Sequence, residues 1–155
     1  MFAPFAYPAF RSIWFANLSA NLGASLQGIG AAWLMTSLTP SHQMLGLIQS
    51  SATIPIMLFG VFAGAIADNY DRRMVMLVSQ AGMLVVSVLL AVLTWQDMIT
   101  PWSLLLLTLV LGIGIALNSP AWQASVREQV GLRDLPQAVS LNTIAFNLAR
   151  TTGPA

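Results

Sequence analysis

Long uncharged runs alternate with short polar turns along almost the whole chain. The runs cover residues 12–38, 44–67, 74–95, 103–120 and 136–155. The first four hold no formal charge, and the fifth holds a single Arg. Because about 20 mostly apolar residues in a helix cross the hydrocarbon core of a bilayer, the pattern predicts an all-α, polytopic membrane bundle of about five transmembrane helices.

Prolines and polar clusters mark the expected ends of these helices. Pro55 lies inside the second run, where a proline is tolerated and marks a kink. Pro120 is expected to stop the fourth helix, which makes 121–135 a polar surface loop with a short amphipathic helix. Asp134 followed by Pro136 is typical of a helix start, so the fifth helix is expected to begin there.

Composition excludes several classes of protein. The apolar fraction is 57% and the charged fraction 7%, against roughly a quarter charged residues in a soluble domain, so we expect an integral membrane protein. With no cysteine and one histidine, His42, neither a disulfide framework nor a metal cluster is expected, and we expect no cofactor. A net charge of +1, without a clustered basic face, argues against nucleic acid as a partner.

The placement of arginines predicts the orientation. Five lie before the first run or in the loops after the second and fourth: Arg11, Arg72, Arg73, Arg127 and Arg133. None lies in the turns after the first and third runs, and Trp95 and Trp102 flank the latter turn like an interfacial aromatic belt. The positive-inside rule therefore predicts a multi-pass protein with a cytoplasmic N-terminus and cytoplasmic loops 68–73 and 121–135. A signal peptide is the alternative for the first run, which is longer than the apolar core of such a peptide.

Polar positions within the runs are the candidates for function. Asn17, Asn21 and Ser25 repeat every four residues and line one stripe of a helix. Two explanations stay open for this stripe: it lines a substrate pathway, or it joins neighbouring helices. Gly60 and Gly64 form a G-x-x-x-G face for which helix packing is expected.

The fourth and fifth runs add a glycine pair and a cation. Gly112 and Gly114 lack the further elements of a nucleotide-binding loop, so close helix packing is expected there. Arg150 should face the bundle or a water cavity, because a cation within the bilayer is costly. Its partner is expected either outside these 155 residues or among carbonyls and amides such as Asn147 or Asn21.

The loop between the second and third runs carries a recognisable motif. It reads G-A-I-A-D-N-Y-D-R-R from Gly64 to Arg73. The sequence resembles the signature G-x-x-x-D-R-x-G-R-R of the major facilitator superfamily of secondary transporters, which joins the second and third helices. Gly64, Asp68, Arg72 and Arg73 match, whereas Asn69 replaces an Arg and Asp71 a Gly. The D-x-x-D-R-R form is similar to the exporter branch related to siderophore and macrolide efflux, whose members are described as transmembrane secretion effectors.

A second stretch, residues 118–150, is similar to the end of the fourth helix, the loop and the fifth helix of that branch. Gly153 and Pro154 also match the antiporter signature G-x-x-x-G-P-x-x-G-G, in which Ala149 replaces the first Gly. Thr108 stands where many proton-coupled members carry an Arg.

The resemblance implies a twelve-helix, two-halved transporter of the bacterial inner membrane, of which this chain would be the first five helices. It implies alternating access, with a conformational switch at the signature loop: Gly64, Asp68, Asp71, Arg72 and Arg73. Asp68 would accept from a facing helix N-terminus or pair with Arg72. In the competing interpretation, Arg72 and Arg73 only fix the topology.

We therefore predict a membrane transporter that exports small amphipathic organic molecules by ion-coupled antiport, with protons as a candidate ion. The alternative is a non-transporting membrane remnant or helper that packs against a partner chain or a missing C-terminal half. An intramembrane enzyme is disfavoured, because no Ser-His pair, carboxylate pair or histidine cluster lies within the runs.

Overall fold

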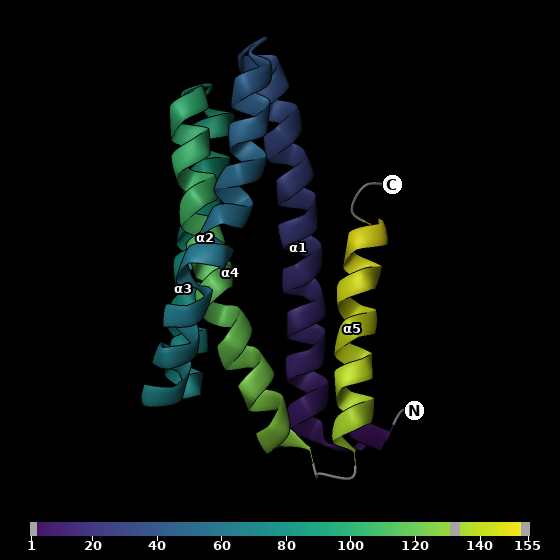
Figure 1. The fold of residues 1–155 in the computed structure, drawn as a ribbon. Helices are drawn as coiled ribbons and strands as arrows, with labels where there is room; N and C mark the ends of the chain where they lie inside the picture. The colour runs from purple at the N-terminus through teal and green to yellow at the C-terminus, as the bar shows by residue number, and fades with distance from the viewer. Residues whose placement is uncertain (1–2, 131–133, 153–155) are drawn as a thin grey trace. The chain divides into compact units, whose positions relative to one another are not determined.

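Helices form all the regular structure in the described part of the chain. The computed structural model describes residues 3–130 and 134–152, apart from the side chains at positions 61, 65, 67, 68, 127–129 and 152. A 3-10 helix precedes five α-helices (Figure 1): η1 (Ala3–Ala6), α1 (Pro8–Leu38), α2 (His42–Asn69), α3 (Arg72–Trp95), α4 (Pro101–Gln129) and α5 (Leu135–Thr152). The all-α prediction is confirmed.

Three of these helices are long and apolar enough to span a membrane by length and composition. The candidate spans are His42–Gly60, Arg72–Trp95 and Pro101–Val126. α1 lies outside this set because amides and hydroxyls such as Asn17, Asn21 and Gln27 lower its hydropathy. α5 has 18 residues and carries Arg150 in its last turn. The chain is therefore a multi-pass membrane protein, and a total of five spans stays a prediction.

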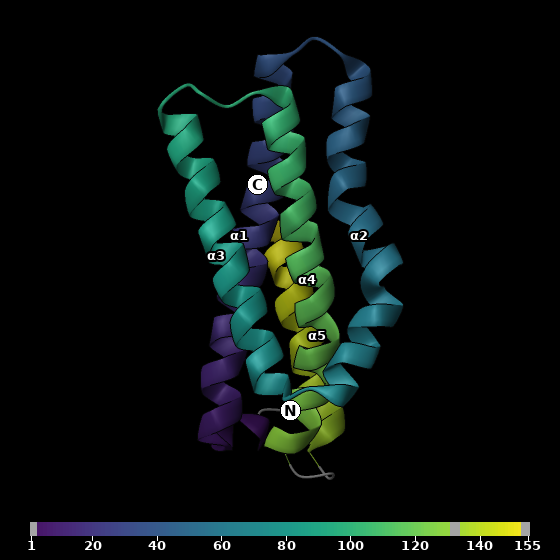
Figure 2. The same ribbon diagram turned by 90° about the vertical axis from the view of Figure 1, so that its left-hand side faces the viewer.

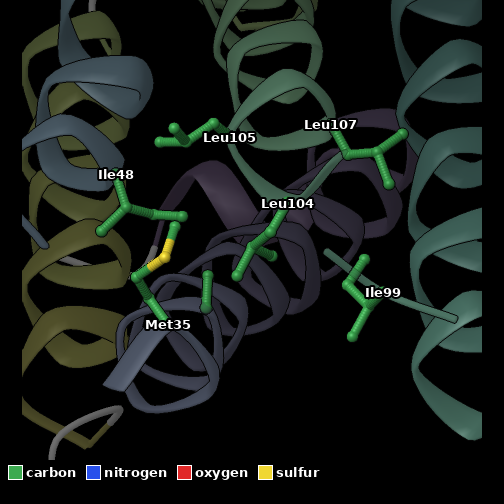
Figure 3. Packing of buried hydrophobic residues seen from close by; sticks show 7 residues of the cluster. Met35, Ile48, Ile99, Leu104, Leu105 and Leu107 are labelled. Atoms are coloured by element: carbon green, nitrogen blue, oxygen red, sulfur yellow. The ribbon is translucent and has the colours of Figure 1, made fainter. Parts of the chain in front are cut away.

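The contacts divide the chain into two units whose boundaries fall within α1 and α4. Unit 1 consists of Met1–Gly30 and Gln123–Ala155, and unit 2 is the continuous segment Ala31–Trp122. In unit 2, α4 lies between α2 and α3 (Figure 2). A buried cluster joins the end of α1, the start of α2 and the start of α4 (Figure 3). This Leu104 cluster consists of Ala31, Met35, Ile48, Ile99, Leu104, Leu105 and Leu107.

The α3–α4 turn of unit 2 is closed by backbone and side-chain hydrogen bonds on both sides. Asp97, with a left-handed φ of 54°, follows the end of α3. The amides of Asp97 and Met98 donate to the carbonyls of Thr94 and Leu93 at 3.2 and 3.0 Å, the pattern of a Schellman motif. At the start of α4, Thr100 and Ser103 cap each other: each backbone amide donates to the other hydroxyl, at 2.8 and 3.2 Å.

Unit 1 is held together by aromatic rings and one buried side-chain hydrogen bond. Phe5 of η1 packs edge-on against Phe10 and Trp14 of α1, with ring centroids 6.0 and 5.1 Å apart. The indole N–H of the buried Trp14 donates to the backbone carbonyl of Leu141 in α5 at 3.1 Å. The hydroxyl of Tyr7 donates to Asp134 Oδ2 at 3.2 Å, just before α5. The start of α1 and α5 therefore lie side by side.

The fourth helix differs from the sequence-based expectation. α4 does not stop at Pro120 but continues to Gln129, so much of the expected loop 121–135 is helical. A proline removes a single backbone donor from a helix, and buried side chains follow Pro120 directly, since Ala121, Trp122 and Val126 are all buried. Their packing favours continuation of the helix over the break. The predicted start at Asp134 agrees with the structure, where α5 begins at Leu135.

Candidate functional site

The α2–α3 loop is short and its backbone is extended. α2 ends at Asn69, and the amide of Tyr70 donates to the carbonyl of Ile66 at 3.0 Å. Tyr70 itself is extended, with φ −116° and ψ 159°, so the chain leaves α2 without the left-handed residue that closes α3. α3 then begins at Arg72. Two residues, Tyr70 and Asp71, thus connect two candidate spans.

Asp71 is the N-cap of α3. Its carboxylate oxygen Oδ1 accepts from the backbone amide of Arg73 at 2.8 Å, and its carbonyl accepts from the amide of Val75 at 3.0 Å. The resemblance to the family signature gave Asp71 as a replacement for a glycine and as part of the switch, but not as a helix cap. An aspartate in the turn just before a helical apolar run is an N-cap signal, so this role was readable from the sequence.

The two loop arginines occupy the first turn of α3. Arg72 is half-buried and Arg73 is exposed. The positive end of the helix dipole disfavours cations in a first turn, and the Asp71 carboxylate beside them offsets this cost. The loop therefore places two cations at positions where they do not stabilise the helix. The side chain of Asp68 lies outside the described part of the structure.

The polar stripe of α1 lies in unit 1. Asn17, Asn21 and Ser25 are all half-buried, as expected for one stripe of a helix. The amide nitrogen of Asn21 donates to the carbonyl of Asn17 within the same helix at 2.8 Å. This bond fixes the Asn21 side chain along α1, so its donor points back onto its own backbone.

Arg150 lies on an exposed part of α5. Its guanidinium carbon is 5.7 Å from the centre of the Phe146 ring, a cation–π distance. Asn147 is also exposed, and its backbone carbonyl accepts from the hydroxyl of Thr151 at 2.7 Å. The contact that the structure gives for Arg150 is thus an aromatic ring, not an amide of Asn147 or Asn21. Gly153 and Pro154 lie outside the described residues.

Three buried amide groups were not predicted as site residues. Within the described residues, Asn118 Oδ1, Gln137 Oε1 and Asn142 Oδ1 are buried without a hydrogen-bond partner. An unpaired buried acceptor costs about 1–3 kcal/mol, so each is a place where a donor from outside the described chain would be stabilised. Gln137 and Asn142 belong to α5, and Asn118 belongs to α4. Burial of an amide is a tertiary property, and spacing along the sequence does not reveal it.

The two glycine pairs behave differently from each other. A methyl group on Gly60 or Gly64 would meet nothing within 4 Å, so the expected packing of this face does not occur within the described chain. A methyl group on Gly112 would lie 3.0 Å from Pro55 Cγ, and one on Gly114 would lie 2.5 Å from Met83 Cγ. The packing predicted for the α4 pair is confirmed, and that predicted for the α2 pair stays a prediction, since no described residue meets that face.

The described residues hold no group of three or more His, Cys, Asp or Glu side chains that could bind a metal ion. The polar side chains of α1 and α5 are amides, hydroxyls and arginines. Such groups bind and orient an organic solute through hydrogen bonds.

Comparison with known proteins gives matches along the whole chain. A family model described as transmembrane secretion effector matches residues 1–155. The staphyloferrin A transporter of Staphylococcus aureus is 31% identical over 135 residues, which is 86% of this chain and 34% of the relative. Macrolide efflux protein A of Streptococcus pyogenes is 20% identical over 115 residues, which is 74% of this chain and 28% of the relative.

A third relative, an uncharacterized MFS-type transporter of Bacillus subtilis, is 28% identical over 111 residues, which is 72% of this chain and 25% of that protein. The chain thus spans about a third or less of the length of these curated relatives. No solved structure matches it.

Proposed function

Since the chain belongs to the transmembrane secretion effector family of the major facilitator superfamily, we propose that it is part of an efflux transporter. The transported solutes are small amphipathic organic molecules, moved by alternating access and driven by antiport of an ion, for which protons are the first candidate. No covalent chemistry on the substrate is required. Two of the relatives are, by name, a transporter of staphyloferrin A and a macrolide efflux protein, which supports a solute of this kind.

The observation that carries the proposal is the α2–α3 loop. Two arginines lie in the first turn of α3, where the helix dipole disfavours them, beside the capping carboxylate of Asp71. Charges in such a place are better explained by a partner surface than by the stability of the helix. We therefore assign Asp71, Arg72 and Arg73 to a conformational switch, together with Gly64 and Asp68.

The switch works by making and breaking charged contacts at the cytoplasmic face. Asp68 accepts from the N-terminus of a facing helix or pairs with Arg72, which closes the transporter on that side. Opening breaks these contacts, so they must be weak enough to exchange within one transport cycle. The short extended loop between two rigid helices transmits this exchange to α2 and α3.

The substrate pathway is assigned to the polar groups of α1 and α5. The candidates are Asn17, Asn21, Ser25, Asn147 and Arg150, to which we add the unpaired amide oxygens of Gln137 and Asn142. These two oxygens accept a donor from the solute, and Arg150 attracts an anionic group. Gly153 and Pro154 belong to the antiporter-like motif that follows them.

Replacement of Asp68 by asparagine tests the switch. We expect Asp68→Asn to slow the export of a macrolide and of a fluorescent amphipathic dye by about tenfold to a hundredfold, because loss of a charged hydrogen bond costs about 1.5–3 kcal/mol. The amount of protein in the membrane should not change. Asp97→Asn, in the α3–α4 turn, is the matched control and should export at the normal rate. Normal export by Asp68→Asn would refute the switch.

Labelling of an introduced cysteine tests the proposed topology. Because the chain has no native cysteine, Asn69→Cys provides a unique thiol in the loop. A membrane-impermeant maleimide should label it in inverted vesicles and leave it unlabelled in intact cells. Gln96→Cys, in the α3–α4 turn, should show the opposite pattern. Labelling of Asn69→Cys in intact cells would show that the loop lies outside the cell and would contradict a cytoplasmic N-terminus.

One observation favours the second candidate, a helper that packs against a partner chain. The face of α2 that carries Gly60 and Gly64 is open in this chain, and such a face allows close approach of another helix. Gly60→Leu, on the same face but outside the proposed switch, should then abolish co-purification of the partner and leave insertion intact. If the face is merely lipid-exposed, Gly60→Leu changes neither export nor co-purification.

A further inference from the structure

α4 comes close to α2 where α2 contains its proline. A methyl group on Gly112 would lie 3.0 Å from Pro55 Cγ and 3.1 Å from the carbonyl oxygens of Ser51 and Ala52. Contacts this short are tighter than most real Cβ contacts, so a side chain on Gly112 requires the neighbouring atoms of α2 to shift by a few tenths of an ångström. Gly112, Pro55, Ser51 and Ala52 all belong to unit 2.

Pro55 weakens α2 at this level. It has no amide hydrogen, so the carbonyl of Ser51, four residues earlier, loses its helical donor. The hydroxyls of Ser50 and Thr53 donate to the carbonyls of Gly46 and Gln49 at 2.9 and 3.0 Å, a pattern that also bends helices. Pro55 is nonetheless fully buried. The weak point of α2 is therefore pressed against the backbone of α4.

We propose that the contact between Gly112 and Pro55 sets the direction of the second half of α2 and thereby the position of the α2–α3 loop. Gly112 is then a positioning residue for the switch, which rests on the proposed function of that loop. Residues 56–69 of α2 form a lever of about 21 Å, so a change of about 10° at Pro55 moves the loop by about 4 Å. Such a displacement is larger than the donor–acceptor distance of a hydrogen bond, so it would break a contact of the loop.

The neighbouring glycine of α4 provides a matched control. A methyl group on Gly114 would also clash, but with the Met83 side chain of α3, at 2.5 Å from Cγ. The clash at Gly114 is with Met83 Cγ, which a change of the Met83 rotamer can relieve, whereas the carbonyls of Ser51 and Ala52 cannot move without α2. Gly82 of α3 is the open control, because a methyl group there would meet nothing within 4 Å.

The experiment measures the position of the loop directly in the full chain. Spin labels on Tyr70→Cys and Ile115→Cys report the distance from the loop to α4, and both positions are exposed, at 68% and 37%. We expect Gly112→Ala and Pro55→Ala each to shift the distance between the labels by more than about 1 Å, because the lever amplifies a shift of a few tenths of an ångström at Pro55. Gly114→Ala and Gly82→Ala should shift it by less than about 1 Å.

Export of the fluorescent dye is measured on the same variants without labels. Gly112→Ala should lower the maximum rate several-fold and leave the half-saturating concentration unchanged, because the loop and not the pathway has moved. An unchanged distance in both Gly112→Ala and Pro55→Ala overturns the proposal. If Gly112→Ala fails to insert, Pro55→Ala decides alone, since it adds no atoms. If Gly112→Ala shifts the distance but the unsubstituted protein exports nothing, the positioning role is supported and the proposed transport function is refuted.

Discussion

The two turns at opposite ends of α3 are built in different ways. The α3–α4 turn has a Schellman motif at Asp97 and Met98, a reciprocal Thr100–Ser103 cap and a buried Ile99. The α2–α3 loop has one extended residue, Tyr70, followed by the capping residue Asp71. Both turns join apolar helices of similar length, so length alone does not explain the difference.

The difference shows where this unit can change its shape. The α3–α4 turn is fixed by hydrogen bonds on both sides and by the Leu104 cluster, which includes Ile99. The α2–α3 loop, by contrast, is exposed at Tyr70 and Asp71 and carries the charges that the family signature contains. An exposed turn outside the packed core is the one that can rearrange at low cost.

The largest expected effect is a loss of stability when the Leu104 cluster, beside the α3–α4 turn, is disrupted. Leu104 is fully buried in the Leu104 cluster, so Leu104→Ala should lower the free energy of unfolding by about 2–5 kcal/mol. Denaturation with increasing SDS in mixed micelles measures this loss. Leu84→Ala, at an exposed position of α3, should change stability by less than about 0.5 kcal/mol. Equal losses of stability for the two variants would contradict the packing of Leu104 in this cluster.

A smaller effect separates the two helix caps. Asp71→Ala and Thr100→Ala should each cost about 1 kcal/mol, because each removes the acceptor of an N-terminal amide. Hydrogen exchange should become faster only in the first turn of the affected helix. Export should fall in Asp71→Ala alone. Asp71→Asn separates capping from charge, since asparagine still caps: it should restore slow exchange and leave export low if the charge matters.

The smallest expected effect concerns Asp97. A residue with a side chain at φ 54° is strained, and glycine is preferred at this position of a Schellman motif. Asp97→Gly should therefore raise stability by about 0.5–1 kcal/mol, measured in the same SDS titration. Tyr70→Gly, in the extended α2–α3 loop, should give no gain. A loss of stability in Asp97→Gly would mean that the carboxylate, rather than the backbone, determines the turn.

Much of this arrangement could be predicted from the order of the residues. The apolar runs predicted helices close to those observed, and Asp134 with Pro136 marked the start of α5. Pro120 misled, because proline weakens a helix locally while the burial of Ala121 and Trp122 depends on contacts far away in the sequence. The end of α4 depends on tertiary packing, which the local sequence around Pro120 does not determine.

The candidate site shows the same limit. Gly60 with Gly64 and Gly112 with Gly114 are similar pairs in the sequence, but only the second pair has neighbours within 4 Å in this chain. The spacing of glycines predicts that they share one helix face, but only the tertiary structure determines which residues contact that face. Asp71 is the opposite case, since its capping role follows from local sequence. The buried amide oxygens of Gln137 and Asn142 required the structure, because burial depends on contacts that spacing along one helix does not contain.

The hydrogen bond from Trp14 to Leu141 has a consequence for biosynthesis. Its partners are 127 residues apart, so at about 5–20 residues per second Leu141 is made roughly 6–25 s after Trp14. During that interval unit 2, which is one continuous segment, can fold. Unit 1 cannot close, and its indole faces lipid, the insertion machinery or a chaperone. The order of assembly is thus set by the chain itself: the interior segment folds first, and the first helix waits for the fifth.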